Sequence, residues 1–314
     1  MRTLLSMIVY MVFDLLSRLP YKALYALSDC MYPVVYHVLR YRRGVVRRNL
    51  ATSFAGESGE RLLDIERGFY RWLCDYCVET IKLMTVSKRE LMRHIEFRGL
   101  ELVEEHFDRG QTCAAILGHS CNWELLSATG QALTRHKEAV CGLIYHPMSS
   151  RLLDRIFIKL RQSMGGVCIP KQDTLRYLES FRRQKLMYLF GYVADQAPRH
   201  ADTHLWLEFL GHDTPVLTGA ERLMRRMGNA VFYVDTERPE RGRYVFTFKL
   251  ITDKTEQEEE YMVTRRFFAM LEDTVRRAPS LYLWSHDRWQ TTRRDFDREY
   301  RTERGHVVRR HESN

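Results

Sequence analysis

The chain has 314 residues, 45% of them hydrophobic, and a formal net charge of +9 from 49 Lys and Arg against 40 Asp and Glu. This length suits one large domain or two small ones with a sizeable core, and no stretch has the composition of a disordered or repetitive segment. Seven cysteines, an odd number, argue against a disulfide framework and favour a reducing compartment. The positive charge favours an anionic partner, which is a membrane surface, a nucleic acid or an acidic carrier protein.

The N-terminal segment predicts membrane attachment. Residues 1–39 are apolar and aromatic, but their densest run, residues 4–13, is shorter than the roughly 20 residues that cross a bilayer as a helix. A removable signal peptide fits poorly, because no small-x-small cleavage site follows the run. Residues 1–48 carry a net charge of +6, two thirds of the whole excess. We predict that residues 1–40 are an uncleaved anchor that inserts into the membrane or lies on it, with the five arginines between 40 and 48 on the head groups. A buried helix pair is the alternative.

The next segment predicts helices. Residues 60–84 carry apolar side chains at helical spacing, and a shorter helix is expected to begin at Gly99 and to end near Arg109. Cys74 and Cys77 form a C-x-x-C pair within the long helix. Because no second pair stands at a zinc-like spacing, we interpret them as core thiols rather than as a metal or redox site.

A histidine and a glutamate follow the most apolar strand candidate. Residues 113–117 are long enough for a buried strand, and the glycine after them allows a sharp turn before His119. Asn122 is a favourable N-cap residue, so a helix is predicted from Trp123 onward, with Glu124 in its first turn. A carboxylate that accepts the hydrogen bond from one imidazole N–H leaves the other ring nitrogen unprotonated and oriented as a base. We therefore predict that Glu124 orients His119 as a general base; a capping histidine beside a solvated glutamate is the alternative.

Cys121 lies two residues from His119. A thiol at this place suggests a nucleophile that carries a covalent intermediate. We favour a packing role for Cys121, because a His–Glu base can activate an acceptor directly, without a covalent intermediate on the enzyme.

Two other predicted strands also end in polar residues. Residues 139–145 predict a strand that ends at His146, and a later, almost uninterrupted apolar run predicts a central buried strand that ends at Asp195 and Gln196. Ligands of α/β proteins bind at the carboxyl ends of strands. His146 is therefore a candidate to assist His119 or to contact a phosphate, and the Asp-Gln pair to bind a hydroxyl or to surround His119. A packed surface histidine and a capped turn are the alternatives.

The remaining pattern alternates strands with helices, which predicts an α/β layer architecture. The predicted helix over residues 150–164 carries a row of basic side chains, which indicates a solvated face or a docking surface for an acidic protein. A nucleic-acid partner is disfavoured, because no helix or sheet gathers basic and aromatic residues together. Other elements are predicted at 167–170, 230–234 and 243–250 (strands) and at 172–183, 221–227 and 256–277 (helices).

The segment Gly-His-Ser-Cys-Asn-Trp-Glu at residues 118–124 resembles the H-x4-E signature of the lipid A biosynthesis acyltransferases, the late lauroyl and myristoyl transferases of bacterial outer-membrane lipid assembly. Further segments agree with this family in order and together cover most of the chain. They are Arg-Asn-Leu at 48–50, Asp-Gln at 195–196, Thr-Gly-Ala at 218–220 and Trp-x-His-x-Arg-Trp at 284–289. One position departs: His146 stands where the family usually has the arginine of Tyr-Arg-Pro.

The resemblance implies a mixed central sheet flanked by helices, of the glycerolipid-acyltransferase type, over residues 41–314, with the anchor before it. It implies direct acyl transfer, without cofactor or metal, from an acyl carrier protein or acyl-CoA thioester to a hydroxyl of a lipid A precursor, at the cytoplasmic face of the inner membrane. The dipole of the helix that begins at Asn122 is expected to help hold the oxyanion. The implied catalytic residues are His119 and Glu124, and the implied substrate-binding residues are Asn122, Trp123, His146, Asp195, Gln196 and Arg288.

Two alternatives stay open at this point. Related transferases with a similar motif acylate amino-acid lipids, glycolipids or pigment precursors. A membrane-bound scaffold that has kept the fold and lost the reaction is the second alternative, and the replacement of the arginine by His146 is its only support.

Overall fold

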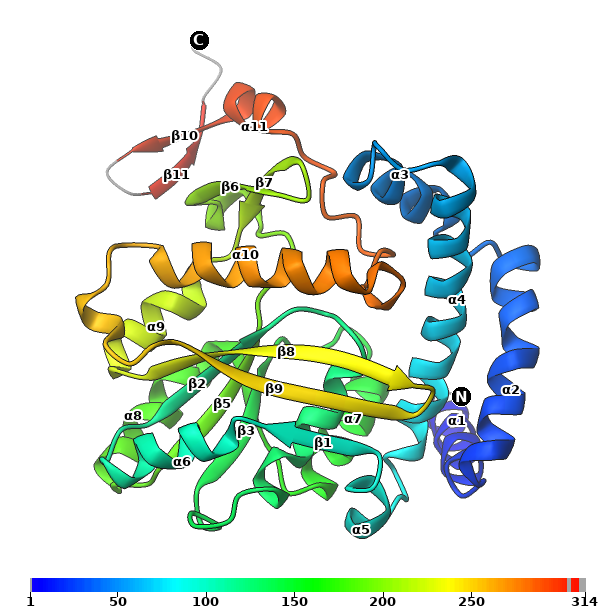
Figure 1. Cartoon of the computed structure of the whole chain (residues 1–314), viewed down its shortest axis with the longest axis horizontal. Helices are drawn as coiled ribbons and strands as arrows, with labels where there is room; N and C mark the ends of the chain where they lie inside the picture. Colours follow the sequence, from blue (N-terminus) through cyan, green and yellow to red (C-terminus); the bar gives the residue numbers. More distant parts are fainter. Residues whose placement is uncertain (1, 304–305, 311–314) are drawn as a thin grey trace.

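The computed structural model of the chain describes residues 2–303 and 306–310. Its centre is a seven-stranded sheet in the order β1–β9–β8–β2–β5–β3–β4 (Figure 1). Neighbouring strands are parallel except in the hairpin of β8 and β9. The strands are β1 (Ile95–Arg98), β2 (Cys113–Leu117), β3 (Val140–Tyr145), β4 (Val167–Pro170), β5 (Tyr188–Val193), β8 (Ala230–Glu240) and β9 (Arg243–Thr252). The predicted mixed sheet is confirmed.

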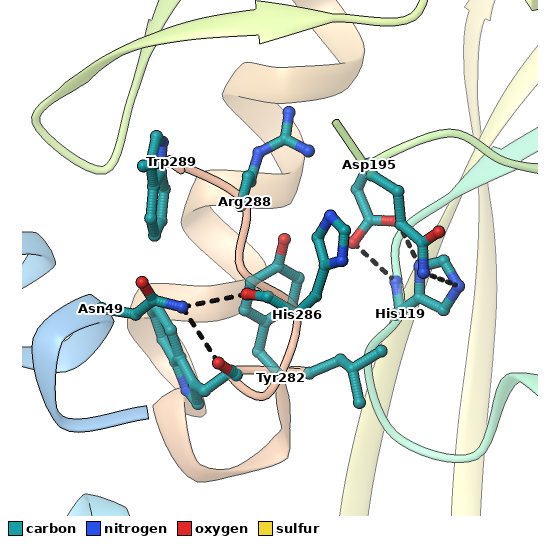
Figure 2. Close-up of a pocket in the computed structure, with 10 residues that line it drawn as sticks. Asn49, His119, Asp195, Tyr282, His286, Arg288 and Trp289 are labelled. Atoms are coloured by element: carbon teal, nitrogen blue, oxygen red, sulfur yellow. Dashed lines mark hydrogen bonds and ion pairs between the residues drawn. The ribbon is translucent and has the colours of Figure 1, made fainter. Parts of the chain in front are cut away.

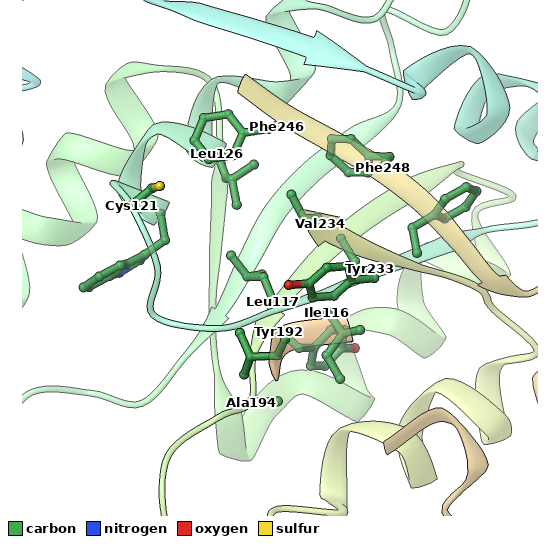
Figure 3. Close-up of a cluster of buried hydrophobic side chains, with 14 of the residues drawn as sticks. Ile116, Leu117, Cys121, Leu126, Tyr192, Ala194, Tyr233, Val234, Phe246 and Phe248 are labelled. Carbon is green, nitrogen blue, oxygen red and sulfur yellow. The ribbon is translucent and has the colours of Figure 1, made fainter. Parts of the chain in front are cut away.

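Strand β2 lies at the middle of the sheet, and all five of its residues are buried. A parallel strand that is covered on both faces needs apolar side chains in both directions, which explains the continuous apolar run. Figure 3 shows the core around it, where side chains of β2, β5, β8 and β9 pack together with Leu126 from the segment after β2. This packing fixes the strand end from which His119 emerges.

Helices cover the sheet. α10 lies along β8 and β9, α6 packs on β9 and β2, and α7 and α8 pack on β4 (Figure 1). The helices are α1 (Arg2–Ser17), α2 (Tyr21–Pro33), α3 (Arg43–Ser53), α4 (Gly59–Lys82), α5 (Lys88–Leu91), α6 (Leu100–Asp108), α7 (Arg151–Ser163), α8 (Thr174–Arg183), α9 (Gly219–Met227), α10 (Met262–Arg277) and α11 (Arg293–Glu299). Two small hairpins, β6 (Leu205–Phe209) with β7 (His212–Val216) and β10 (Tyr300–Glu303) with β11 (His306–Arg309), complete the fold.

The segment after β2 differs from the predicted α-helix. It is a 3-10 helix, η2 (Trp123–Gln131), and the side chain of Asn122 makes no capping hydrogen bond to it. The hydroxyls of Ser127 and Thr129 donate to the carbonyls three residues before them, those of Glu124 and Leu126. Such local side-chain hydrogen bonds compete with the α-helical pattern and are compatible with the tighter turn.

The N-terminal helices pack against α4, and α2 lies along it (Figure 1). At the end of α1, the Ser17 carbonyl accepts from the Thr85 hydroxyl, and the Leu19 carbonyl accepts from the Lys82 ammonium. None of the helices in the described part of the chain has the length and hydropathy of a transmembrane span. The predicted membrane anchor and its boundary at residue 40 stay predictions.

Strand β3 requires a glycine at position 142. A Cβ there would overlap the Val167 carbonyl on β4 and lie 2.7 Å from Phe190 Cε1 on β5. We expect Gly142→Ala to lower the free energy of unfolding by about 2–3 kcal/mol, since overpacking forces backbone shifts. Gly44→Ala is the control, because its Cβ meets nothing within 4 Å in α3, and it should be neutral or stabilising. Urea unfolding of both variants checks this; equal midpoints would contradict it.

Candidate functional site

His119 emerges at the carboxyl end of β2, where the chain leaves the sheet. The C-terminal segment holds this turn by backbone hydrogen bonds. The Cys121 N–H donates to the Leu281 carbonyl (2.9 Å), and the Leu283 N–H donates to the His119 carbonyl (3.1 Å). The backbone of His119 is therefore fixed by a segment more than 150 residues away in sequence.

Asp195 is the carboxylate that binds His119. Its Oδ1 lies 2.5 Å from His119 Nδ1, and its Oδ2 accepts the His119 backbone N–H at 3.0 Å. The side chains are 3% and 14% exposed, so the pair is nearly shielded from water. Burial alone would raise the pKa of the Asp195 carboxyl, but the His119 ring and amide and the Arg288 charge outweigh it and hold this pKa well below its ordinary value. Asp195 therefore stays ionised at neutral pH.

The second ring nitrogen of His119 faces Gln196. Because Asp195 is ionised and can only accept, the hydrogen bond at Nδ1 requires the ring proton to be on that nitrogen. The other nitrogen, Nε2, is then an acceptor, and the Gln196 amide nitrogen lies 3.3 Å from it. This tautomer, assigned from the partners, is the one that a general base needs.

These groups line a small pocket (Figure 2). The sheet supplies one wall, and the C-terminal segment after α10 supplies most of the rest. The lining residues are Asn49, His119, Asp195, Gln196, Tyr282, Leu283, Trp284, His286, Arg288 and Trp289. Asn49 braces the C-terminal wall, since its amide donates to the carbonyls of Trp284 and His286, both at 3.0 Å.

His286 is a neutral imidazole on the wall of this pocket. Burial, helped by the charge of Arg288, lowers its pKa to about 4. Its Nε2 accepts the backbone N–H of Ala197 at 3.2 Å, so the proton lies on Nδ1. No hydrogen bond joins that Nδ1 to another residue within the described ranges. His286 therefore offers an N–H donor beside His119.

Arg288 is buried beside the same pocket. Its guanidinium lies over the rings of Phe268 and Phe209, 5.1 and 5.6 Å from their centroids. One nitrogen, Nη2, reaches the Pro215 carbonyl at 3.5 Å, whereas Nε and Nη1 are buried without a hydrogen-bond partner in the described part of the structure. Arg288 thus places a cation with spare donors near Asp195.

Comparison with known proteins identifies the family. The sequence model of the bacterial lipid A biosynthesis acyltransferases matches residues 1–291. This chain belongs to that family. The protein is therefore a lipid A acyltransferase, with a lipid acceptor and an acyl donor. A search of curated proteins found no match.

The structure corrects the predicted contact between His119 and Glu124 in this acyltransferase. No hydrogen bond or ion pair joins these two residues in residues 2–303 and 306–310. Both Glu124 oxygens are bound by Arg161 of α7, which donates from Nε to Oε2 (2.7 Å) and from Nη2 to Oε1 (2.8 Å). The reason is electrostatic: a carboxylate that is 2% exposed needs a charged partner, and the guanidinium supplies two parallel donors.

Two of the predicted substrate-binding residues of the acyltransferase are core residues. Asn122 is fully buried, lies outside the pocket lining, and donates to Glu79 of α4 at 3.0 Å. Trp123 stacks on Tyr76 with centroids 4.5 Å apart and meets the His119 ring edge-on at 4.8 Å. Trp123 packs on His119 from outside the pocket lining, and its indole N–H donates to Glu124 at 3.1 Å.

His146 lies exposed at the end of β3, outside the pocket lining, with Nδ1 3.0 Å from the Pro147 carbonyl. The structure therefore does not bring it to His119. Gln196 and Arg288 do reach the pocket.

Cys121 is buried, and burial raises the pKa of its thiol to about 12, which fits packing rather than nucleophilic attack.

The pocket residues that sequence reasoning missed include Asn49, Tyr282 and His286. A signal was present for two of them. Asn49 stands in the Arg-Asn-Leu segment and His286 in the Trp-x-His-x-Arg-Trp segment that carry the family resemblance. Tyr282 had no such signal, because its place depends on the strand-like pairing between the C-terminal segment and the turn after β2.

We expect Glu124→Gln to destabilise the fold by about 3–5 kcal/mol, since it leaves the charge of Arg161 buried without its anion. The double variant Glu124→Leu/Arg161→Met should recover much of this loss, because an apolar pair of similar size removes both charges. Glu179→Gln is the control: its partner Arg226 is 61% exposed, and the expected loss is below about 1 kcal/mol. Denaturant unfolding measures all three, and a neutral Glu124→Gln contradicts the structural role.

Proposed function

We propose that this acyltransferase moves a fatty acyl chain from an acyl carrier protein or CoA thioester to a hydroxyl of a lipid A precursor, with His119 as the general base. The observation that supports this most strongly is the 2.5 Å contact from His119 Nδ1 to Asp195, which leaves Nε2, beside the Gln196 amide, able to accept a proton. In this proposal Asp195, rather than Glu124, orients the base.

The proposed reaction is a direct transfer. The acceptor hydroxyl displaces the Gln196 amide from His119 Nε2, gives its proton to that nitrogen, and attacks the thioester carbonyl with its oxygen. The new C–O bond forms, the C–S bond breaks, and the departing sulfur takes the proton back from His119. Asp195 stabilises the imidazolium that exists between these two steps.

Two pocket donors suit the negative charge that develops on the carbonyl oxygen. The N–H of His286 Nδ1 has no partner in the described part of the chain, and the Gln196 amide becomes free when the hydroxyl displaces it. Arg288 adds a positive field at the same wall. In this proposal these side chains replace the N-terminus of η2 as the site of oxyanion stabilisation.

His146 bears on the alternative of an inactive scaffold. The scaffold hypothesis rests on the missing arginine at this position. His146 is exposed and lies outside the pocket lining. A histidine in place of the family's arginine therefore leaves the proposed base and its partner untouched. The geometry therefore favours an active transferase.

The decisive variant is Asp195→Asn. We expect kcat to fall by about 10⁴-fold with little change in KM, because the amide favours the wrong tautomer of His119. The control is Asp235→Asn, a buried aspartate of β8 that lies outside the pocket lining, for which kcat per folded molecule should stay unchanged. Acyl transfer from an acyl carrier protein thioester to a lipid A precursor is measured with purified, detergent-solubilised protein. Unchanged kcat in a folded Asp195→Asn protein would rule out this assignment.

We also propose that the N-terminal helices lie on the cytoplasmic surface of the inner membrane. Met7, Met11 and Leu15 stand one turn apart on α1 and are 57–68% exposed. Further exposed apolar side chains follow at Val38 and Leu39. A helix with one apolar face and insufficient length to span suits the interface.

The predicted role of the arginine cluster becomes smaller in this proposal. Arg43 and Arg47 both pair with Glu66, at 2.8 and 2.9 Å, and Arg48 pairs with Asp287 at 2.5 Å. Three of the five arginines are thus partly neutralised within the chain. The apolar face of α1 therefore carries most of the proposed attachment.

The triple variant Met7→Glu/Met11→Glu/Leu15→Glu tests the attachment. We expect its partition onto anionic phospholipid vesicles to fall by roughly two orders of magnitude, since about 1 kcal/mol of apolar burial is lost at each site. The control is Leu102→Glu/Tyr177→Glu, which places charges on exposed apolar side chains of α6 and α8. Vesicle flotation measures both, and equal flotation of the triple variant and the native chain refutes this role of α1.

A further inference from the structure

Glu79, in the last turns of α4, is a buried carboxylate that joins three distant parts of the chain. Its Oε1 accepts the Tyr25 hydroxyl of α2 at 2.9 Å. Its Oε2 accepts the Tyr244 hydroxyl of β9 at 2.6 Å and the Asn122 amide at 3.0 Å. Arg238 of β8 lies 3.7 Å from Oε1. Three neutral donors and a cation thus converge on one side chain that is outside the pocket lining.

The contact with Asn122 holds a strained turn. Cys121, immediately before Asn122, has a φ of +54°, which is unfavourable for a residue with a Cβ. The turn is fixed on one side by the Cys121 N–H bond to Leu281 and on the other by Glu79. A strained conformation persists only where its surroundings over-determine it, so the loss of the Glu79 contact allows the turn to relax.

Relaxation of this turn would change the surroundings of the His119 imidazole. The residue after Asn122 is Trp123, whose ring meets the His119 imidazole edge-on at 4.8 Å. His119 itself is only two residues before Cys121. The orientation of the imidazole therefore depends on a chain of direct contacts that begins at Glu79.

The same carboxylate is attached to the N-terminal helices. Besides Tyr25, α2 contributes Ser28, which donates to Asp75 at 2.7 Å, one turn from Glu79 on α4. Arg241 bridges Asp75 (2.6 Å) and Asp29 of α2 (2.7 Å). The docking of α2 is thus specified by buried polar contacts on the same face of α4 that holds the turn after His119.

We propose that Glu79 is a positioning residue for His119, and that through Tyr25 it makes the docking of α2 a condition for a working base. The inference rests on the proposed function for its effect on transfer. Its effect on the orientation of His119 is independent of any substrate. The N-terminal helices, in this view, are part of the active-site structure in addition to any contact with the membrane.

The test is Tyr25→Phe in the full-length chain. This variant removes one hydroxyl from Glu79 and leaves the pocket lining intact. We expect kcat to fall about tenfold with unchanged KM for donor and acceptor, the effect of one lost hydrogen bond on positioning. The NMR signal of the His119 Nδ1 proton, which reports its bond to Asp195, should shift. Vesicle flotation should stay unchanged.

The matched control is Tyr70→Phe. Tyr70 is a buried tyrosine at the interface of α4 with the N-terminal region, and its hydroxyl donates to the Tyr41 carbonyl at 2.6 Å, away from Glu79. It should leave both kcat and the His119 signal unchanged. Equal effects of the two variants would mean general loosening and would overturn the proposal, as would a Tyr25→Phe protein with native kcat and a native His119 signal. If the native chain showed no transfer, the His119 signal alone would decide the positioning role, while the proposed function would fail separately.

Discussion

The hydrogen bond between His119 and Asp195 depends on the register of two parallel strands. β2 and β5 are neighbours, and Leu117 pairs with Val193, the last residue of each strand. His119 and Asp195 each follow two residues later, and the Ala194 N–H extends the ladder by donating to the Leu117 carbonyl at 3.1 Å. A shift of one residue would turn one of the two side chains to the other face of the sheet. By fixing this register, the packed core around β2 sets the geometry of the proposed base and its partner.

Register also explains what the sequence could and could not predict. The apolar runs of β2 and β5 identify both strands, and the polar residues at their ends are visible without a structure. Which strands are neighbours is not encoded locally, because β2 pairs with β5 and β8 rather than with β1 or β3. The spacing of His119 and Glu124 along the chain favoured a local pair. The actual partner of His119 comes from 76 residues further on.

Charge counts predicted the structure less well than strand patterns did. The reason is again that the partners of these residues come from distant parts of the chain. The basic excess near the N-terminus indicated an anionic surface, yet Arg43 and Arg47 share Glu66, which lies on α4. Composition records how many cations a segment has, whereas their availability depends on acids brought near by folding. The exposed apolar stripe of α1, by contrast, is a local property, because its residues are spaced along one helix.

Glu124 and Asp195 have different hydrogen-bond partners, and the type of partner indicates which carboxylate is structural and which can take part in proton transfer. Glu124 is bound at both oxygens by the guanidinium of Arg161, which stays charged at all relevant pH values, so its charge is already compensated and it locks α7 to the segment after β2. Asp195 is bound by a backbone N–H and by an imidazole, a group whose charge can change. Only in the Asp195–His119 pair does the electrostatic attraction become stronger when the imidazole ring accepts another proton. In the proposed mechanism, the electrostatic coupling that base catalysis needs therefore belongs to Asp195, whereas Glu124, the carboxylate nearer in sequence, holds α7 against the segment after β2.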